Sequence, residues 1–312
     1  MKLISIVIPS YNEQDNVVLL ANKVVEQLEG KYNYELIFVD DGSSDGTLEN
    51  LKKLNQQNSK IHYLSFSRNF GHQKALRCGL AYSQGDAVIS MDADMQHPPY
   101  MIPQLIEKWE AGYDIVYTQR LDTQDVSIFK RTTSSFFYKM TSRLADIEME
   151  EGTADFRLLD RKVANIINRT GESNLFIRGF IVWMGFKKYK IAYKPEPRHS
   201  GVTKYTFKKM FLFALNGITS FSVKPLYIST VLGVIISFFS FLYALYAIYN
   251  YFFKNGVVDG WTSILVSVLF IGGLQLIILG IIGEYLGKLF MQTKNRPDYI
   301  VSESSMKEVA SS

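Results

Sequence analysis

The sequence predicts an α/β domain with a mostly parallel sheet, followed by amphipathic interface helices and a hairpin of two transmembrane helices. Three observations support this prediction. Strand-like and helix-like segments alternate through the first 120 residues, carboxylates follow two of the predicted strands, and two long apolar runs lie after residue 225. Such alternation is typical of a parallel sheet with helices on both faces.

Each element is predicted from its local pattern. Short apolar runs bounded by turn residues predict strands at residues 3–9, 34–41, 60–67, 86–94 and 113–120. Apolar residues at helical spacing predict helices at 14–30, 47–57, 72–85 and 99–112. In sheets of this kind ligands bind beyond the carboxyl ends of the strands, so the residues that follow the strands are the candidate site.

Two pairs of aspartates stand at the ends of predicted strands. Asp40 and Asp41 end the second strand, and Asp92 and Asp94 end the fourth. Because alternate residues of a strand point the same way, we expect Asp92 and Asp94 to face one ligand while Ala93 lies against the sheet. Carboxylate oxygens suit Mg²⁺ or Mn²⁺, which bridge protein carboxylates and diphosphates. The alternative is that these aspartates cap the following helix.

Other classes of site find no support in the sequence. The first strand leads into PSYNEQDN rather than GxGxxG, and there is no GxxxxGK[ST] and no HExxH or CxxC motif. The single cysteine, Cys78, rules out an internal disulfide, and a net charge of +4 gives no reason to expect nucleic-acid binding. The N-terminal apolar run is interpreted as a buried strand and not as a signal peptide.

Two runs near the C-terminus predict membrane spans. Residues 226–253 contain no charge, and residues 263–289 contain only Glu284 and Lys288, near their end. Lysines and arginines flank the outer ends of both runs, whereas the connection between them holds only Lys254, so both termini are expected in the cytoplasm. The alternative is two buried helices of a large soluble core. The polar C-terminal tail is expected to be disordered.

Two further segments mix cations with aromatic side chains. Residues 127–144 and 204–225 are predicted to be amphipathic helices at the bilayer surface. The predicted organisation is therefore an α/β domain at 1–200, an interfacial segment at 201–225, two transmembrane helices within 226–290, and a cytoplasmic tail at 291–312.

Five motifs in order resemble those of family-2 glycosyltransferases. They are IVIPSYNEQDN, VDDGSSDGT, RNFGHQKAL, DADMQHPP and DFRLLDR. More narrowly, residues 4–300 resemble the polyprenyl-phosphate glycosyltransferases, which include dolichol-phosphate mannosyltransferases and bacterial undecaprenyl-phosphate glucosyltransferases. This resemblance implies a GT-A fold, and the absence of a QxxRW motif argues against a processive polysaccharide synthase.

The resemblance also implies roles for individual residues. Donor-binding residues would be Pro9, Tyr11, Glu13, Asp40, Gly71 and Asp92, with Asp40 bonding the base and Asp92 beside the sugar and diphosphate. Asp94 and Gln96 would hold Mg²⁺ or Mn²⁺, and His97 is a further candidate neighbour of the metal. Asp155 matches the proposed catalytic base, and Arg198 and Lys204 match a loop that closes over the phosphates.

The resemblance implies that the sugar is transferred to a polyprenyl phosphate, and such an acceptor has less need of a catalytic base than a sugar hydroxyl has. A phosphate monoester has a second pKa of about 6 and is mostly ionised at neutral pH. Asp155 is therefore expected to orient the acceptor or a neighbouring arginine as much as to remove a proton, and Asp155→Asn is expected to lose less rate at pH 8 than at pH 6. Cations between the sheet and the first span could bind phosphate or form a solvated basic face: Arg120, Lys130, Arg131, Arg157, Arg161, Arg178 and Arg198. Of these, Arg120, Arg131 and Arg198 are the predicted phosphate contacts.

The predicted function is inverting transfer of one sugar from a nucleotide sugar to a polyprenyl phosphate. UDP-glucose and undecaprenyl phosphate are the first choices, with UDP-N-acetylglucosamine, a UDP-aminoarabinose derivative and GDP-mannose as alternative donors. The predicted location is the plasma membrane, with the catalytic domain in the cytoplasm. Glycines including Gly283 and Gly287 would permit self-association of the spans. From the family, a flippase and a downstream glycosyltransferase are expected partners. The alternative of another class is an inactive membrane-bound sensor of nucleotide sugars or a scaffold.

Overall fold

A mixed eight-stranded sheet forms the centre of the N-terminal domain in the computed structural model. The structure describes residues 2–121, 153–172, 175–193, 219, 222–253 and 260–307. The strand order is β7-β5-β6-β4-β1-β2-β3-β8, in which β6 and β8 run antiparallel to their neighbours and the other pairs are parallel. The strands are β1 (Leu3–Ser10), β2 (Asn33–Asp40), β3 (Ile61–Phe66), β4 (Ala87–Ser90), β5 (Ile115–Arg120), β6 (Thr153–Asp160), β7 (Lys188–Tyr193) and β8 (Val301–Ser304).

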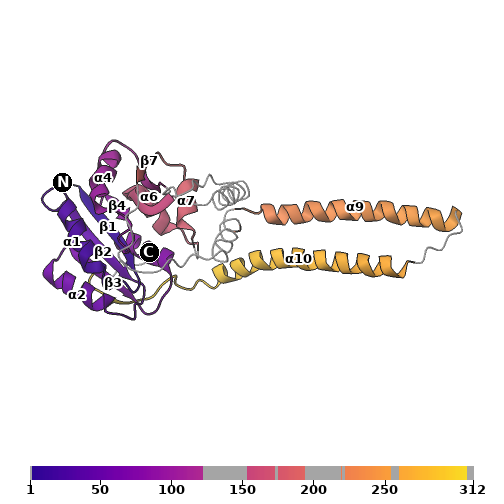
Figure 1. Ribbon diagram of the computed structural model, residues 1–312, viewed down its shortest axis with the longest axis horizontal. Helices are drawn as coiled ribbons and strands as arrows, with labels where there is room; N and C mark the ends of the chain where they lie inside the picture. Colours follow the sequence, from indigo (N-terminus) through magenta and orange to yellow (C-terminus); the bar gives the residue numbers. More distant parts are fainter. Residues whose placement is uncertain are drawn as a thin grey trace.

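Helices cover both faces of this sheet (Figure 1). One face packs against α1 (Val17–Leu28), α2 (Thr47–Gln57) and α4 (Ile102–Glu110), which follows the 3₁₀ helix η1 (Pro99–Met101). The other face packs against α3 (His72–Tyr82), α6 (Arg161–Arg169) and α7 (Ile177–Trp183). This is the two-faced arrangement that the alternating sequence pattern predicts.

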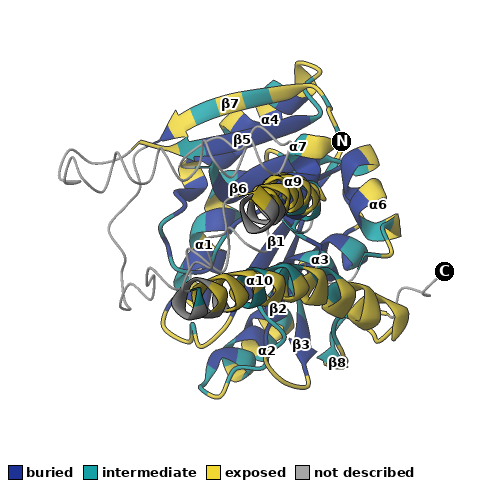
Figure 2. Ribbon diagram, turned by 90° about the vertical axis from the view of Figure 1, so that its right-hand side faces the viewer, coloured by how far each residue is buried: buried dark blue, intermediate teal, exposed yellow. Residues whose placement is uncertain are grey.

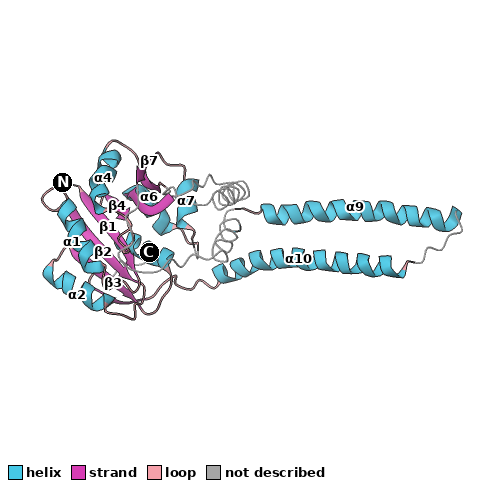
Figure 3. Cartoon of the chain, in the orientation of Figure 1, coloured by secondary structure: helices cyan, strands magenta, loops and turns pink. Residues whose placement is uncertain are grey.

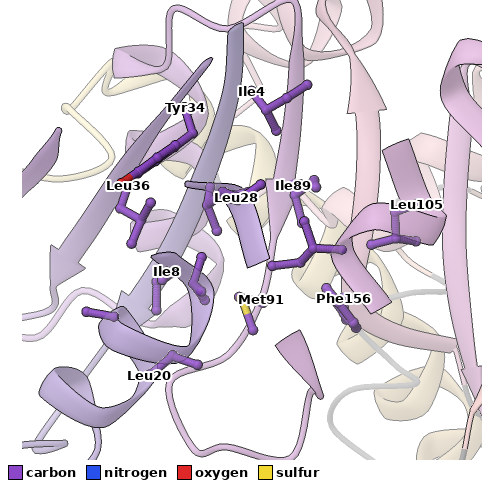
Figure 4. Packing of buried hydrophobic residues seen from close by; sticks show 14 of the residues in the cluster. Ile4, Ile8, Leu20, Leu28, Tyr34, Leu36, Ile89, Met91, Leu105 and Phe156 are labelled. Carbon is purple, nitrogen blue, oxygen red and sulfur yellow. The ribbon is translucent and has the colours of Figure 1, made fainter. Parts of the chain in front are cut away.

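The core on the first face is made of aliphatic strand residues that alternate with residues on the opposite face. Ile4, Ile8, Leu36 and Ile89 come from three adjacent parallel strands, and Phe156 comes from the antiparallel β6 (Figure 4). Each of these side chains is at most 1% exposed. The close packing fixes the strands, and therefore also fixes the loops at their carboxyl ends.

The five predicted strands and four predicted helices are all present. The fourth strand ends at Ser90, so Asp92 and Asp94 lie in the turn just beyond it. The sequence patterns did not predict β6, β7, α6 or α7. The short, partly exposed β7 and the seven-residue α7 carry too few residues for a clear periodic signal.

The expectation of a disordered tail at residues 302–312 is wrong for residues 302–306. Val301–Ser304 forms β8, which pairs with the edge strand β3, and the Ser305 amide donates to the Tyr63 carbonyl at 3.0 Å. Just before β8, Tyr299 stacks on Phe66 with ring centroids 5.1 Å apart. A polar composition does not preclude order here, because the segment is bound through its backbone to an open sheet edge.

Two long helices extend away from the sheet domain (Figures 1 and 3). They are α9 (Lys224–Phe253) and α10 (Trp261–Thr293), and they match the two predicted spans in position. Within them Lys224–Tyr243 and Val266–Thr293 are long and apolar enough to cross a membrane. The exposed colouring of both helices in Figure 2 argues against the alternative of buried core helices. The predicted amphipathic helix at 127–144 and most of that at 204–225 lie outside the described residues.

Candidate active site

A cavity of about 320 Å³ lies at the carboxyl edge of the parallel strands. Its walls come from the segments that follow β1, β2, β3 and β4, as expected for a sheet of this topology. It is lined by Pro9, Ser10, Tyr11, Glu13, Asp41, Asn69, Gly71, His72, Ala75, Asp92, Ala93 and Asp94. The expected crevice shared by acidic residues after two strands is therefore present.

The segment after β1 forms the first wall. Pro9, Tyr11 and Glu13, which the resemblance assigns to donor binding, all line the cavity. Side chains between β2 and the first residue of α2 bind the backbone of this segment. The backbone N–H of Asn12 donates to Ser43 Oγ and that of Glu13 to Thr47 Oγ1, both at 2.9 Å. These bonds hold the segment in place without using the side chains that face the cavity.

Asp40 and Asp41 lie in different environments although they are neighbours. The carboxylate of Asp40 accepts bonds from the Ser43 amide at 3.1 Å and Ser65 Oγ at 2.7 Å, and it does not line the cavity. Asp41 lines the cavity and accepts bonds from the Phe70 and Gly71 amides at 2.6 and 2.9 Å. Burial raises the pKa of Asp41, partly offset by these two backbone bonds.

The backbone at Gly71 has φ of +104°, a conformation that residues with a side chain rarely adopt. The residue therefore lets the chain turn from β3 into α3 while its amide reaches Asp41. The sequence assigned a donor-binding role to Asp40 and Gly71, whereas the structure brings Asp41 and Gly71 together at the cavity.

Asp92, Asp94 and Gln96 are partly exposed, while Ala93, Met95 and His97 between them are buried. This alternation is the one expected for Asp92 and Asp94, and both carboxylates line the cavity. Neither caps the next helix, since η1 begins after Pro98 with no side-chain cap.

His97 supports this turn from behind. Its Nδ1 accepts a bond from the Asp92 amide at 2.9 Å, and its ring stacks on Phe156 with centroids 5.3 Å apart. His97 is 5% exposed and does not line the cavity, so it orders the turn and is not placed as a metal ligand.

Asp155 lies at the centre of an ion-pair cluster. Arg178 binds both of its oxygens, with Nε to Oδ1 at 2.8 Å and Nη2 to Oδ2 at 2.6 Å, and Arg157 Nη2 donates to Oδ1 at 2.6 Å. The side chains of Asp155 and Arg157 are 5% and 2% exposed, and that of Arg178 is 30% exposed. Burial alone would raise the pKa of Asp155, but the guanidinium groups of Arg178 and Arg157 hold it far below its ordinary value.

His72 connects this cluster to the cavity. Its Nε2 is 2.8 Å from Asp92 Oδ1, and its Nδ1 is 3.9 Å from Asp155 Oδ2. A ring nitrogen of His72 and one carboxylate oxygen each from Asp92 and Asp155 all lie within 4.8 Å of one another. These three atoms are close enough to bind one metal ion. Both Asp155 oxygens already bind arginine, however, so the partly exposed oxygens of Asp92 and Asp94 fit a hard divalent cation better.

Several predicted site residues are not brought to the cavity. Arg120 is exposed at the end of β5, and neither Arg120 nor Gln96 lines the cavity among the described residues. Arg131, Arg198 and Lys204 lie outside the described residues. Arg161, another member of the predicted basic set, donates to the Gly85 carbonyl at 2.6 Å and takes a structural role.

The sequence led us to expect that Asp155 orients a neighbouring arginine, but it did not identify Arg157 and Arg178 as the partners. The spacing of Asp155 and Arg157 could have indicated that they share a face of a strand. No local signal identifies Arg178, because its contact with Asp155 spans 23 residues of sequence.

The mostly parallel sheet, with an acidic cavity at its carboxyl edge, is a GT-A-like α/β domain. The chain belongs to glycosyltransferase family 2, whose sequence model matches residues 5–167, and it is therefore a glycosyltransferase.

Similar proteins cover nearly the full chain. An uncharacterized glycosyltransferase of Synechocystis is 45% identical over 96% of this chain and 95% of its own length. The SfII prophage-derived bactoprenol glucosyl transferase of Shigella flexneri is 40% identical over 96% of this chain and 98% of its own length. Among solved structures, glucosyl-3-phosphoglycerate synthase of Mycobacterium tuberculosis is 17% identical with a TM-score of 0.49, covering 70% of this chain and 78% of its own.

Proposed function

We propose that the protein transfers glucose, with inversion, from UDP-glucose to undecaprenyl phosphate in a metal-dependent reaction. The observation that carries the proposal is the acidic cavity at the carboxyl edge of a family-2 domain that is joined to two long apolar helices. The bactoprenol glucosyl transferases of Shigella, about 40% identical over nearly the full chain, support the choice of sugar and acceptor.

The donor occupies the cavity of about 320 Å³. Pro9, Tyr11 and Glu13 line the nucleotide end, together with Asp41. The base contact first assigned to Asp40 is better given to Asp41, because Asp40 uses its carboxylate on Ser43 and Ser65. Asp92 lies by the sugar and diphosphate, where its distance of 2.8 Å to His72 fixes its orientation.

Asp94 is the proposed carboxylate ligand of Mg²⁺ or Mn²⁺, with Gln96 beside it. When bound, the cation supplies positive charge that stabilises the departing nucleoside diphosphate. The backbone N–H of Gln96 donates to Asp94 Oδ1 at 3.1 Å, which restrains the carboxylate at the rim of the cavity. The turn that carries both acids is held by His97 and by Phe156 behind it.

The acceptor enters from the membrane. The two apolar helices anchor the domain, and the distribution of lysine and arginine gives a cytoplasmic catalytic domain with both termini on the same side. Gln292 at the end of α10 donates to the Gly171 carbonyl at 2.6 Å, which ties the hairpin to the sheet domain. Arg131, Arg198 and Lys204 remain proposed contacts of the acceptor or donor phosphates. Self-association and cooperation with a flippase and a second glycosyltransferase complete the proposal.

The competing function is an inactive sensor or scaffold. The paired acids and the connected Asp155 cluster favour an enzyme, since a sensor needs no such arrangement beside the cavity. The test is transfer of labelled sugar by the purified full chain in detergent, with Mn²⁺, across a panel of UDP-glucose, UDP-N-acetylglucosamine, a UDP-aminoarabinose derivative and GDP-mannose. Undecaprenyl phosphate is the acceptor, and undecaprenol, which lacks the phosphate, is the matched control.

We expect label in the lipid fraction only with undecaprenyl phosphate, and most of it from UDP-glucose. A different preferred donor would change the assigned sugar while retaining the reaction. Binding of nucleotides without transfer from any donor would favour the sensor.

A further inference from the structure

The Asp155 carboxylate has little capacity left to accept a proton from a substrate. Its two oxygens accept three hydrogen bonds of 2.6 to 2.8 Å from guanidinium groups, and its side chain is 5% exposed. Protonation would break charge-assisted bonds that are among the strongest in proteins. The carboxylate is therefore built to hold two arginines in place.

The two arginines differ in what they can reach. Arg157 is 2% exposed and also donates from Nη2 to the Ala154 carbonyl at 3.0 Å, so it is enclosed within the domain. Arg178 stands on α7 with its side chain 30% exposed, and its Nε and Nη2 both face Asp155. This geometry fixes the plane of the Arg178 guanidinium, and the side chain as a whole is partly exposed.

Arg178 also lies between two cavities. On one side, Asp155 leads to His72 at 3.9 Å and then to Asp92 at 2.8 Å, which lines the donor cavity. On the other side is a small cavity of about 40 Å³, in which the cations Arg157, Arg178 and Lys188 lie among uncharged residues. The uncharged lining residues are Ile115, Tyr117, Thr153, Ile181 and Val182. No acidic side chain lines this second cavity among the described residues.

The size and charge of the second cavity suit a small anionic group. A cavity needs roughly 10–15 Å³ to hold one buried water, so this cavity has room for about three oxygen atoms of that size. It is too small for a sugar ring, and its cations disfavour a further cation. A phosphate monoester has three terminal oxygens and matches the planar fork of arginine.

We propose that Arg178 binds the phosphate of the acceptor, and that Asp155 is a positioning residue that acts through Arg178 and not a general base. The inference rests on the proposed function, whose acceptor is a polyprenyl phosphate. In the reaction an oxygen of the acceptor phosphate forms a bond to the anomeric carbon of the sugar. The bond from that carbon to the nucleoside diphosphate breaks, and the electron pair leaves with the diphosphate. An ionised acceptor phosphate brings no proton to the bond that forms, so no base is consumed.

The test compares Arg178→Ala, Arg178→Lys and Asp155→Asn with the unaltered full chain, using undecaprenyl phosphate and UDP-glucose. Arg169→Ala, which removes an exposed arginine from the end of α6, is the matched control. We expect Arg178→Ala to raise the KM for the lipid and lower kcat/KM by roughly 10- to 100-fold, the loss typical of hydrogen bonds to a charged group. Affinity for UDP, measured by calorimetry, should stay within about twofold, a factor too small to account for that loss.

Three further results separate a positioning role from a base. Added guanidinium should restore part of the Arg178→Ala activity, while Arg178→Lys, which lacks the fork, should recover little. The double variant Asp155→Asn with Arg178→Ala should be no slower than the slower single variant, because both changes remove one function. Since Asp155→Asn leaves Arg157 buried with a weaker partner and can impair folding, the Arg178 variants carry the test.

Several outcomes would overturn the inference. They are an unchanged lipid KM in Arg178→Ala, or losses that multiply in the double variant. If the unaltered chain transfers no sugar to undecaprenyl phosphate, the proposed function fails, which is a different result from transfer that is indifferent to Arg178.

Discussion

The link between Arg77 and Asp298 gives a direct test of how the C-terminal segment is held. Arg77 on α3 donates from Nη1 to Asp298 Oδ2 at 2.5 Å, and the side chains are 14% and 17% exposed. Arg77 also donates to the Glu172 carbonyl at 2.8 Å and to the Thr170 carbonyl. The pair therefore joins the chain that leaves α10 to the helix whose first residue is His72.

Asp298→Ala removes the only carboxylate that is bonded to Arg77 among the described residues and leaves a nearly buried guanidinium with carbonyl partners only. A bond to a charged group contributes about 1.5–3 kcal/mol, and loss of one partner of a buried pair costs more. Because the pair is not fully buried, we expect about 2–3 kcal/mol of destabilisation. At about 2–4 °C per kcal/mol for a domain of 150–250 residues, Tm should fall by about 4–12 °C.

Cys78, the only cysteine in the chain, provides the assay. It is fully buried in the cluster that contains Phe66 and contacts Tyr299, and burial raises its pKa to about 12. A thiol-reactive fluorophore should therefore react only when this region opens on heating. The matched control is Glu303→Gln, which removes the exposed 2.8 Å ion pair with Lys52 but keeps a side-chain oxygen that can accept the Tyr63 hydroxyl bond. It should change Tm by at most about 4 °C. Equal, small shifts for both variants would refute the described packing of the C-terminal segment.

Three other predictions concern the site and the core. Since the guanidinium groups keep the pKa of Asp155 below its ordinary value of about 3.9, the stability it contributes is present at neutral pH and is lost only as pH falls through the lower folded value. Asp155→Asn should accordingly lose the same factor of transfer rate at pH 6 and pH 8, in contrast to the expectation from sequence, and a loss that shrinks at pH 8 would restore a role as base. Gly71→Ala forces a side chain onto φ of +104° at the cavity and should weaken UDP binding by about 1–2 kcal/mol in calorimetry, while unchanged affinity would contradict a tight backbone turn there. Gly79→Ala places a methyl group 2.2 Å from Val7 Cγ1 and should cost about 1–3 kcal/mol in denaturant unfolding, with partial recovery when Val7→Ala is added.

The sequence predicted the elements that have strong periodic patterns. Thr47–Gln57 is a helix with the same limits as the predicted one, and residues 226–253 lie within α9. A helix or strand that buries one face carries apolar residues at regular spacing. This spacing is visible within the sequence of the single segment. The carboxyl-edge cavity followed from topology, so Asp92 and Asp94 could be placed together before any coordinates existed.

The features that the sequence did not predict share a different cause, which is their dependence on long-range contacts. β8 depends on the open edge of β3, which is more than 230 residues away in sequence, as the pairing of Ser65 with Glu303 illustrates. The choice between Asp40 and Asp41 depends on which one meets Ser65, and the Asp155–Arg178 pair depends on the packing of α7. A segment pattern does not contain such long-range contacts.

The proposed function requires a divalent cation, held by Asp94 at the carboxyl edge of the sheet, to assist transfer of glucose to a lipid phosphate. The most direct measurement is the rate at which the purified full chain moves label from UDP-glucose to undecaprenyl phosphate, with Mn²⁺, with excess chelator, and in Asp94→Ala. We predict a loss of roughly 100-fold or more in chelator and in Asp94→Ala, the scale expected for a lost electrostatic contact to the leaving group. Normal turnover of Asp94→Ala in excess chelator would contradict the claim.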